Sequence, residues 1–282
     1  MQSIFTIDVE DWFHILDVPV PYLSQSHWGT LPSRVEVGFR RLLDLLAEKN
    51  ARATCFFLAS TARRFPHLGK EAVEMGHEVA SHGTWHRLVY ELDRPTFLED
   101  IRDARHLLQD LSGQSVGGHR APGFSVTEDT PWFYDAVVEA GYTYDSSIFP
   151  GPRNHGGLRT HHRAPYSMQV EHGTLVEFPI TVADVLVRPV CFFGGGYLRL
   201  FPWPVIRTMA HRVLGEGRPV IFYVHPREVD LYHPQVPMKI TRTFKSYVNL
   251  DTTEGKIRQI LEEFPVCTFT EFLAGHPVAA VA

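Results

Sequence analysis

Short apolar runs alternate with amphipathic segments along the first half of the chain. The runs at 4–7 and 53–58 have the composition of buried strands, and 77–81 is a shorter third one. Apolar residues recur at helical spacing in four segments, which predicts helices over 35–46, 62–75, 96–111 and 131–140. Gly76 and Gly141 follow two of these segments, where helices commonly end. The resulting order of elements is a βα repeat.

The same pattern returns near the end of the chain. Val220–Val224 is the strongest candidate for a buried strand, and amphipathic segments flank it at 205–214 and 253–264. Between about 149 and 204 the periodicity gives way to Pro, Gly and His, which predicts an insertion over one face rather than a domain. Repeated βα units predict a single α/β domain with a parallel sheet, closed or wound, and helices outside. In such folds, functional side chains gather at the carboxyl ends of the strands.

The composition narrows the class of protein. Of the 282 residues, 44% are hydrophobic and 21% are charged, which is typical of a chain that folds around a large core. The formal net charge of −5 argues against a general nucleic-acid binder, because such proteins neutralise phosphates with a basic surface. The three cysteines, Cys55, Cys191 and Cys267, are far apart and odd in number, which predicts buried thiols rather than a disulfide framework or a zinc ribbon.

The amino-terminal residues show no export signal. Residues 2–7 run straight into an acidic cluster, without the basic region, apolar stretch and cleavage site of a signal peptide. No run of about 18 apolar residues occurs, so no transmembrane segment is expected. We therefore expect a cytoplasmic protein.

Three carboxylates follow the first predicted strand: Asp8, Glu10 and Asp11. On its own, such a cluster is typical of a solvated turn in which an aspartate caps a helix. Asp8 and Glu10 are two residues apart, however, so they point to the same side while the chain stays extended. These two carboxylates could then share one site.

Two histidines, His82 and His86, follow the predicted strand at 77–81. Histidines at this spacing converge on one cation if the segment forms a helical turn, as in several zinc hydrolases; the alternative is two unrelated polar residues of a turn. Gly83 stands where the zincin motif has its glutamate base, so a base must come from elsewhere, such as Asp8 or its neighbours. Two histidines and one carboxylate leave zinc positions open for water and a carbonyl, which predicts metal-assisted hydrolysis.

Two further polar residues stand next to a turn and a strand. Arg120 precedes the turn Ala121–Gly123 and either lies on the surface or ion-pairs with a carboxylate base and aims it. His225 ends the predicted strand at 220–224 and is either a hydrogen-bonded core residue or a general acid for a leaving amine. Its position at the end of a strand favours the acid.

Taken in order, these clusters resemble the motifs of the polysaccharide deacetylases, carbohydrate esterase family 4. The motifs read TIDVED at 6–11, HGTWH at 82–86, RAPG at 120–123, YDSS at 144–147 and FYVH at 222–225. The ordered set, which spans residues 6 to 225, is specific, whereas each motif alone is weak. The Gly-rich segment and the tail at 226–282 resemble the subgroup that accompanies exopolysaccharide loci in exosortase-bearing bacteria.

The resemblance implies a distorted (β/α) barrel and hydrolysis of N-acetyl groups from the amino sugars of a polysaccharide or its precursor. It also implies a divalent metal, usually Zn²⁺, on one carboxylate and two histidines. Carried over position by position, the metal histidines are His82 and His86. The base, the residue that orients it, the acid and a supporting catalytic residue are, in that order, Asp8, Arg120, His225 and Asp145.

The first motif departs from the family pattern of two adjacent aspartates, base and then ligand. Val9 occupies the ligand position, and valine cannot bind a metal. Glu10 is the predicted replacement, because it shares the side of Asp8 and has a longer reach. Asp11 is the second choice, and Asp8 itself could be the ligand. Family members that act on cyclic amides without a metal make a metal-independent amidohydrolase an alternative, and a catalytically silent carbohydrate-binding protein is another.

The expected partner is therefore an N-acetylated glycan. Three aromatic residues flank the motifs and either stack on sugar rings or complete the core: Trp12, Trp85 and Tyr223. The consecutive glycines at 194–196 lack the Lys-Ser/Thr of a phosphate loop, which argues against a nucleotide site.

Overall fold

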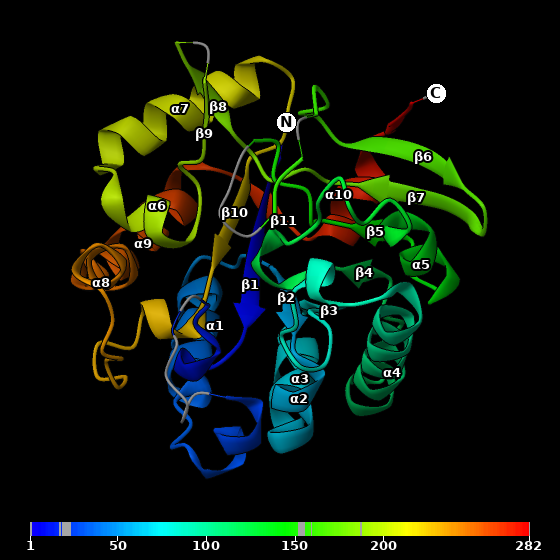
Figure 1. Cartoon of the computed structure of the whole chain (residues 1–282). Coiled ribbons are helices and arrows are strands. Elements are labelled where there is room, and N and C mark those ends of the chain that lie inside the picture. Colours follow the sequence, from blue (N-terminus) through cyan, green and yellow to red (C-terminus); the bar gives the residue numbers. More distant parts are fainter. Residues whose placement is uncertain are drawn as a thin grey trace.

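Ten short strands form one sheet that extends from the centre of the molecule to one edge (Figure 1). The computed structural model describes residues 2–16, 18, 24–151, 156–158, 160–186 and 188–281. In spatial order the strands are β10 (Ile221–Val224), β1 (Ser3–Val9), β2 (Thr54–Phe57), β3 (Glu78–Ser81), β4 (Gly118–His119), β5 (Tyr144–Asp145), β7 (Gly173–Glu177), β6 (Tyr166–Val170) and β12 (Ala279–Ala280), with β11 (Val266–Cys267) also paired to β1. Neighbours from β10 to β7 run parallel, and β6 is antiparallel to β7.

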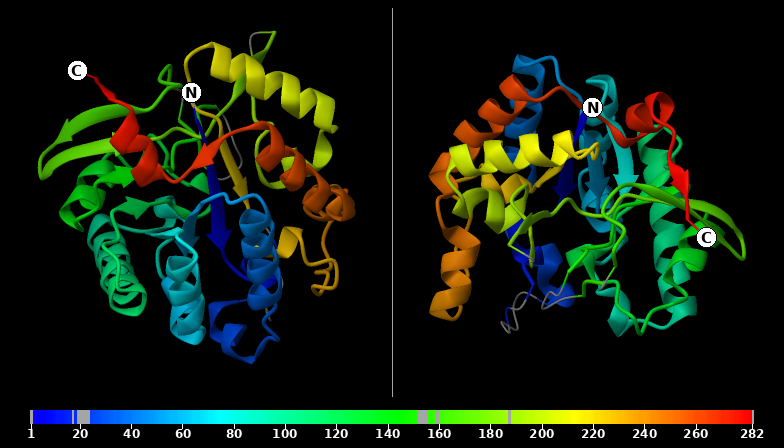
Figure 2. Two further views of the ribbon diagram at one scale, coloured as in Figure 1. Left: turned by 180° about the vertical axis from the view of Figure 1, so that it is seen from behind. Right: turned by 90° about the horizontal axis from the view of Figure 1, so that it is seen from above.

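Helices surround these strands, as the view from above in Figure 2 shows. They are α1 (Val35–Glu48), α2 (Ala59–Arg64), α3 (Pro66–Glu74), α4 (Arg94–Ser112), α5 (Phe133–Glu139), α6 (Gly195–Leu200), α7 (Trp203–Gly215), α8 (Ile240–Tyr247), α9 (Thr253–Glu263) and α10 (Phe269–Gly275). A separate antiparallel pair consists of β8 (Ala183–Val185) and β9 (Arg188–Val190). The predicted single α/β domain with a parallel sheet is thereby confirmed.

The barrel is distorted, as expected. In the part of the chain that the structure describes, no ladder joins β7 back to β10. Gly194 instead extends the β10 edge through a parallel bridge to Tyr223.

The two faces of β1 pack against different groups of residues. Ile7 and Val9 are fully buried in a large cluster with the apolar residues of α1 to α5. Ile4 lies in a second cluster, together with apolar residues of other strands and of α10. Because successive side chains of a strand point to opposite faces, Asp8 shares the face of Ile4, whereas Val9 faces the helices.

The helix predicted at 62–75 is two helices, α2 and α3, and this expectation was wrong. The break lies at Phe65, which has φ −131° and ψ 68° and precedes Pro66. A proline ring disfavours the α conformation of the residue before it, so the first helix ends there.

The insertion predicted at about 149–204 is partly a component of the sheet. Strand β7 pairs with β5 in parallel, and β6 forms a hairpin with β7. Both strands mix polar with apolar residues, so no continuous apolar run marks them. The remaining part of the segment carries β8, β9 and α6.

The cysteines and the helices can also be compared with what the sequence predicts. Cys55, Cys191 and Cys267 are free and buried, as predicted. None of the helices described here has the length and apolar character needed to cross a bilayer.

Candidate active site

A cavity of about 390 Å³ opens where β1, β3 and β10 end. Six candidate site residues from the sequence line it: Asp8, Glu10, His82, His86, Tyr223 and His225. They lie at or just beyond the carboxyl ends of these parallel strands, which meet at one edge of the sheet. Three distant parts of the chain thus contribute to a single site.

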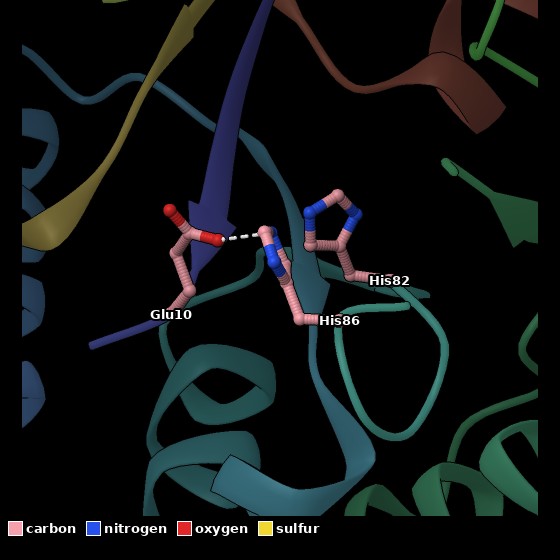
Figure 3. Close-up of side chains that lie close together, drawn as sticks. All are labelled: Glu10, His82 and His86. Atoms are coloured by element: carbon pink, nitrogen blue, oxygen red, sulfur yellow. Dashed lines mark ion pairs between the residues drawn. The ribbon is translucent and has the colours of Figure 1, made fainter. Parts of the chain in front are cut away.

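Glu10, His82 and His86 form a compact group within this cavity. Each offers one ligand atom, and these atoms all lie within 4.8 Å of one another. His86 Nε2 is 2.7 Å from Glu10 Oε2, and both side chains are 6% exposed. Figure 3 shows these two side chains facing each other, with the ring of His82 beside His86. Two imidazoles and one carboxylate are the donor set of many catalytic zinc sites.

The histidine pair converges without the expected helical turn. Residues 82–88 are not helical, and Gly83 and His86 have φ values of 73° and 53°. Asp100 of α4 holds this loop, because Thr84 donates to it twice, from N to Oδ2 at 2.9 Å and from Oγ1 to the backbone oxygen at 2.9 Å. A fixed loop therefore aims both rings, and nothing in the local sequence identifies Asp100 as its anchor.

The protonation of this group follows from its contacts. His82 Nδ1 lies 2.8 Å from the backbone oxygen of Arg120, which can only accept, so Nδ1 carries the proton and Nε2 has a free lone pair. Burial lowers the pKa of His82 to about 4, so the ring is neutral at pH 7. Burial alone would raise the pKa of Glu10, but interactions with His86, His225 and His82 lower it overall, so Glu10 is a carboxylate.

Asp8 is held by Arg120, which is fully buried and not on the surface. Arg120 Nη1 is 2.6 Å from Asp8 Oδ1 and 2.8 Å from Thr6 Oγ1. Ser146 accepts from Nε and Nη2 of the same guanidinium, each at 3.2 Å, and the ring of Phe56 lies 4.1 Å from its central carbon. A guanidinium held on all sides fixes the orientation of Asp8.

His225 faces both carboxylates of the cavity. Its Nε2 lies 3.8 Å from Asp8 Oδ2 and 3.8 Å from Glu10 Oε1. Its Nδ1 is 3.3 Å from Glu228 Oε2, and Glu228 is buried and ion-paired with Arg199. Burial lowers the pKa of His225. Glu228 was not predicted as a site residue, although its place three residues after His225 is the spacing of a capping box.

Asp11, the second choice as a ligand, serves as the cap of a 3-10 turn at 12–14. It accepts from the backbone N–H groups of Trp12 and Arg34, each at 3.0 Å, and from the hydroxyl of Ser33. Its own N–H donates to Nδ1 of His14 at 2.9 Å. The commonplace interpretation of a capping aspartate is thus correct for Asp11.

His14 is a further residue of the cavity that the sequence analysis did not single out. Its ring stacks on that of His86 at 5.8 Å. Burial lowers the pKa of His14 to about 3, so the ring is neutral. Because Nδ1 accepts a hydrogen bond from Asp11, the proton is on Nε2, and His14 is a hydrogen-bond donor rather than a ligand.

Asp145, predicted as a supporting catalytic residue, does not line the cavity and is fully buried. Its Oδ1 accepts from His119 Nδ1 at 2.7 Å and from Ser147 Oγ at 2.8 Å, and its Oδ2 accepts from the backbone N–H of Ser147 at 2.8 Å. Ser147 Oγ in turn accepts from the N–H of Ala121 at 2.7 Å. Asp145 is thus a positioning residue that holds the segment carrying Arg120.

We expect Asp145→Ala to lower the free energy of unfolding by about 3–5 kcal/mol, because it leaves the buried partners of a charged group unpaired. Urea unfolding measures this loss. Asp129→Ala, which removes an exposed aspartate, is the control and should change the free energy by less than about 0.5 kcal/mol. A loss below about 1 kcal/mol for Asp145→Ala would contradict the role assigned to it.

Of the three aromatic candidates, only Tyr223 is among the described residues that line the cavity. Trp12 is 5% exposed and packs against Phe13, and its Nε1 donates to the backbone oxygen of Pro32 at 2.9 Å. Trp12 therefore completes the core and cannot stack on a sugar. Trp85 is partly buried outside the lining of the cavity.

Two family models match the chain. Residues 32–144 match the polysaccharide deacetylase model, and residues 146–274 match a domain of unknown function, DUF3473. A peptidoglycan deacetylase of Helicobacter pylori is 28% identical over 113 residues, which are 40% of this chain and 38% of the relative. The peptidoglycan deacetylase-like protein FGM2 of Gibberella zeae is 34% identical over 132 residues, 45% of this chain and 36% of the relative. The chain thus spans less than half the length of these curated relatives.

Solved structures share the architecture of the whole chain. An allantoinase superposes with a TM-score of 0.60 at 17% identity, over 98% of this chain and 91% of the other. A family 4 carbohydrate esterase from Streptomyces lividans, solved with acetate, superposes with a TM-score of 0.52 at 14% identity, over 99% and 98% of the two chains. At such identities the likeness concerns the fold. Over residues 32–144 the chain is thus similar to the polysaccharide deacetylases, and over its whole length it shares their fold.

Proposed function

We propose that this protein is a metal-dependent hydrolase that removes N-acetyl groups from the amino sugars of a polysaccharide or its precursor. The observation that carries the proposal is the cavity in which a two-histidine, one-carboxylate group, the Asp8–Arg120 pair and His225 meet. The H. pylori relative, named a peptidoglycan deacetylase, supports the same class of reaction. On the resemblance of the tail at 226–282, we further propose a role in exopolysaccharide biosynthesis.

The residues present fit a divalent metal. Glu10 Oε2 is buried and receives no well-aligned hydrogen bond, although His86 Nε2 lies close to it. A lone pair of this kind beside two imidazole nitrogens suits a cation better than a protein donor. Glu10, His82 and His86 would hold the ion, and a bound Zn²⁺ would polarise the acetamide carbonyl.

The remaining groups supply the proton transfers. Asp8 accepts a proton from the attacking water through Oδ2, because Oδ1 is held by Arg120. His225 Nε2 faces this same oxygen, so it takes up the proton from Asp8 and passes it to the departing amine. The C–N bond breaks as the C–O bond to the water oxygen forms, which leaves acetate and a free amino sugar.

An assay of acetate release tests the proposal. With N-acetylated oligosaccharides of glucosamine, galactosamine and mannosamine as a panel, we expect release from at least one substrate by protein that carries about one zinc ion per chain. A chelator should lower the rate by at least about 100-fold, and added zinc should restore it.

Two outcomes would contradict this function, and each points to an alternative. Activity that survives complete metal removal would indicate a metal-independent amidohydrolase. Glycan binding without acetate release, even with zinc supplied, would indicate a catalytically silent carbohydrate-binding protein.

A further inference from the structure

The cavity has more cationic than anionic lining residues, although the whole chain carries a net charge of −5. Its carboxylates are Asp8 and Glu10. Its basic lining residues are Arg199, Arg227, Arg242 and Lys245. All four lie outside residues 32–144, the part that matches the polysaccharide deacetylase model. A cavity of one sign concentrates ligands of the opposite charge.

Most of the charges in this region are already paired within the protein. Asp8 is paired with Arg120, and Glu10 faces His86. Arg199 is ion-paired with Glu228 and donates through Nη2 to two backbone oxygens at the end of α8. In the proposed chemistry Asp8 and Glu10 are occupied by the water and the metal, and Arg199 is held by Glu228 and the backbone.

Arg227 has two buried nitrogens without such partners. Its Nε and Nη1 are buried and donate no hydrogen bond, and it forms no ion pair with any described carboxylate. Burial lowers the pKa of the Arg227 guanidinium, Glu10 and Tyr247 act to raise it, and Arg242 lowers it further. Arg242 itself donates from Nη2 to the backbone oxygen of Leu16 at 2.7 Å, while its Nε has no acceptor. Burying an unpaired guanidinium is costly, so its retention in a cavity wall points to a ligand.

We propose that Arg227, assisted by Arg242, binds an anionic group of the substrate, a carboxylate or a phosphate, that lies near the N-acetylated sugar. This proposal rests on the proposed function and names the substrate class of that same site. A carboxylate or phosphate presents two oxygens to the edge of a guanidinium, which makes arginine the residue best suited to such groups. The substrate is therefore an acidic glycan or a phosphorylated sugar precursor rather than a neutral polymer.

The test compares three probes on the zinc-loaded protein. Tetra-N-acetylchitotetraose is neutral, a hyaluronan tetrasaccharide carries carboxylates, and UDP-N-acetylglucosamine carries phosphates. We expect a higher kcat/KM for one of the charged probes, and the preferred one identifies the source of the anion. Arg227→Gln should lower kcat/KM for that probe by about 10- to 100-fold, mainly through KM, and change the neutral probe by less than about three-fold. Arg227→Lys should recover part of the loss. Arg207→Gln, which removes an exposed arginine on α7, is the matched control and should match the wild type.

A binding measurement separates this proposal from the proposed function. Calorimetric titration of the same probes should show the charge preference and its loss in Arg227→Gln, whether or not acetate is released. Equal affinity of wild type and Arg227→Gln for the charged probes would overturn the anion site, and so would equal losses on charged and neutral probes. Charge-dependent binding with no acetate release from any probe would leave the anion site standing and refute the deacetylase.

Discussion

Replacing His82 by alanine is expected to abolish stoichiometric zinc binding and to lower acetate release by about 1000-fold or more. In the proposed site His82 is one of three protein ligands, and its Nε2 is aimed by the hydrogen bond from Nδ1 to the backbone of Arg120. With this imidazole removed, Glu10 and His86 retain two donors, which is too few to hold a zinc ion tightly. Elemental analysis of the purified variant and the acetate assay measure the two effects together.

The matched control for this variant is His211→Ala. His211 is exposed on α7 and pairs with Glu263, so its loss should leave metal content and rate unchanged. Thermal unfolding in a chelator shows whether the His82 variant still folds. A folded variant that keeps about one zinc ion per chain would refute the assigned ligand set.

Replacing Asp8 by asparagine is expected to lower kcat by about 100- to 10,000-fold while zinc content stays near one ion per chain. Asparagine has nearly the same shape but cannot take a proton from water. Since Asp8 Oδ1 is bound to Arg120, we infer that Asp8 is the base and not a ligand. Glu10→Gln is the complementary variant and should lose the metal.

This comparison decides between the carboxylates left open by the first motif. If Asp8→Asn loses zinc and Glu10→Gln keeps it, their roles are reversed. The asparagine variant also leaves the buried Arg120 without its anionic partner, which costs about 3–5 kcal/mol of stability. The rates of acetate release by Asp8→Asn and Glu10→Gln should therefore be measured well below the unfolding temperature of each variant.

The local sequence pattern determined much of the fold and part of the site. Alternation along β1 places Asp8 on one face and Val9 on the other, because side chains of a strand alternate. The helical spacing around Phe39 and Leu42 predicts α1, whose apolar stripe is buried as expected. The ends of β3 and β10 were likewise located correctly, and with them His82 and His225.

Other features were decided only by the tertiary structure. Asp11 and Asp145 are acidic residues within motifs, yet one caps a turn and the other holds His119 and Ser147. Trp12 flanks a motif but packs into the core. Conversely, Glu228 became visible as a site residue only through its contact with His225.

The physical reason is that periodicity reports which side of an element a residue occupies, but not which group it meets there. Arg120 and Asp8 are separated by 112 positions in the chain, and their pairing depends on how β4 and β1 are spaced in one sheet. The partner of a buried polar group is chosen by packing between distant segments, and in this protein that choice separates the carboxylates of the cavity from those that hold the fold.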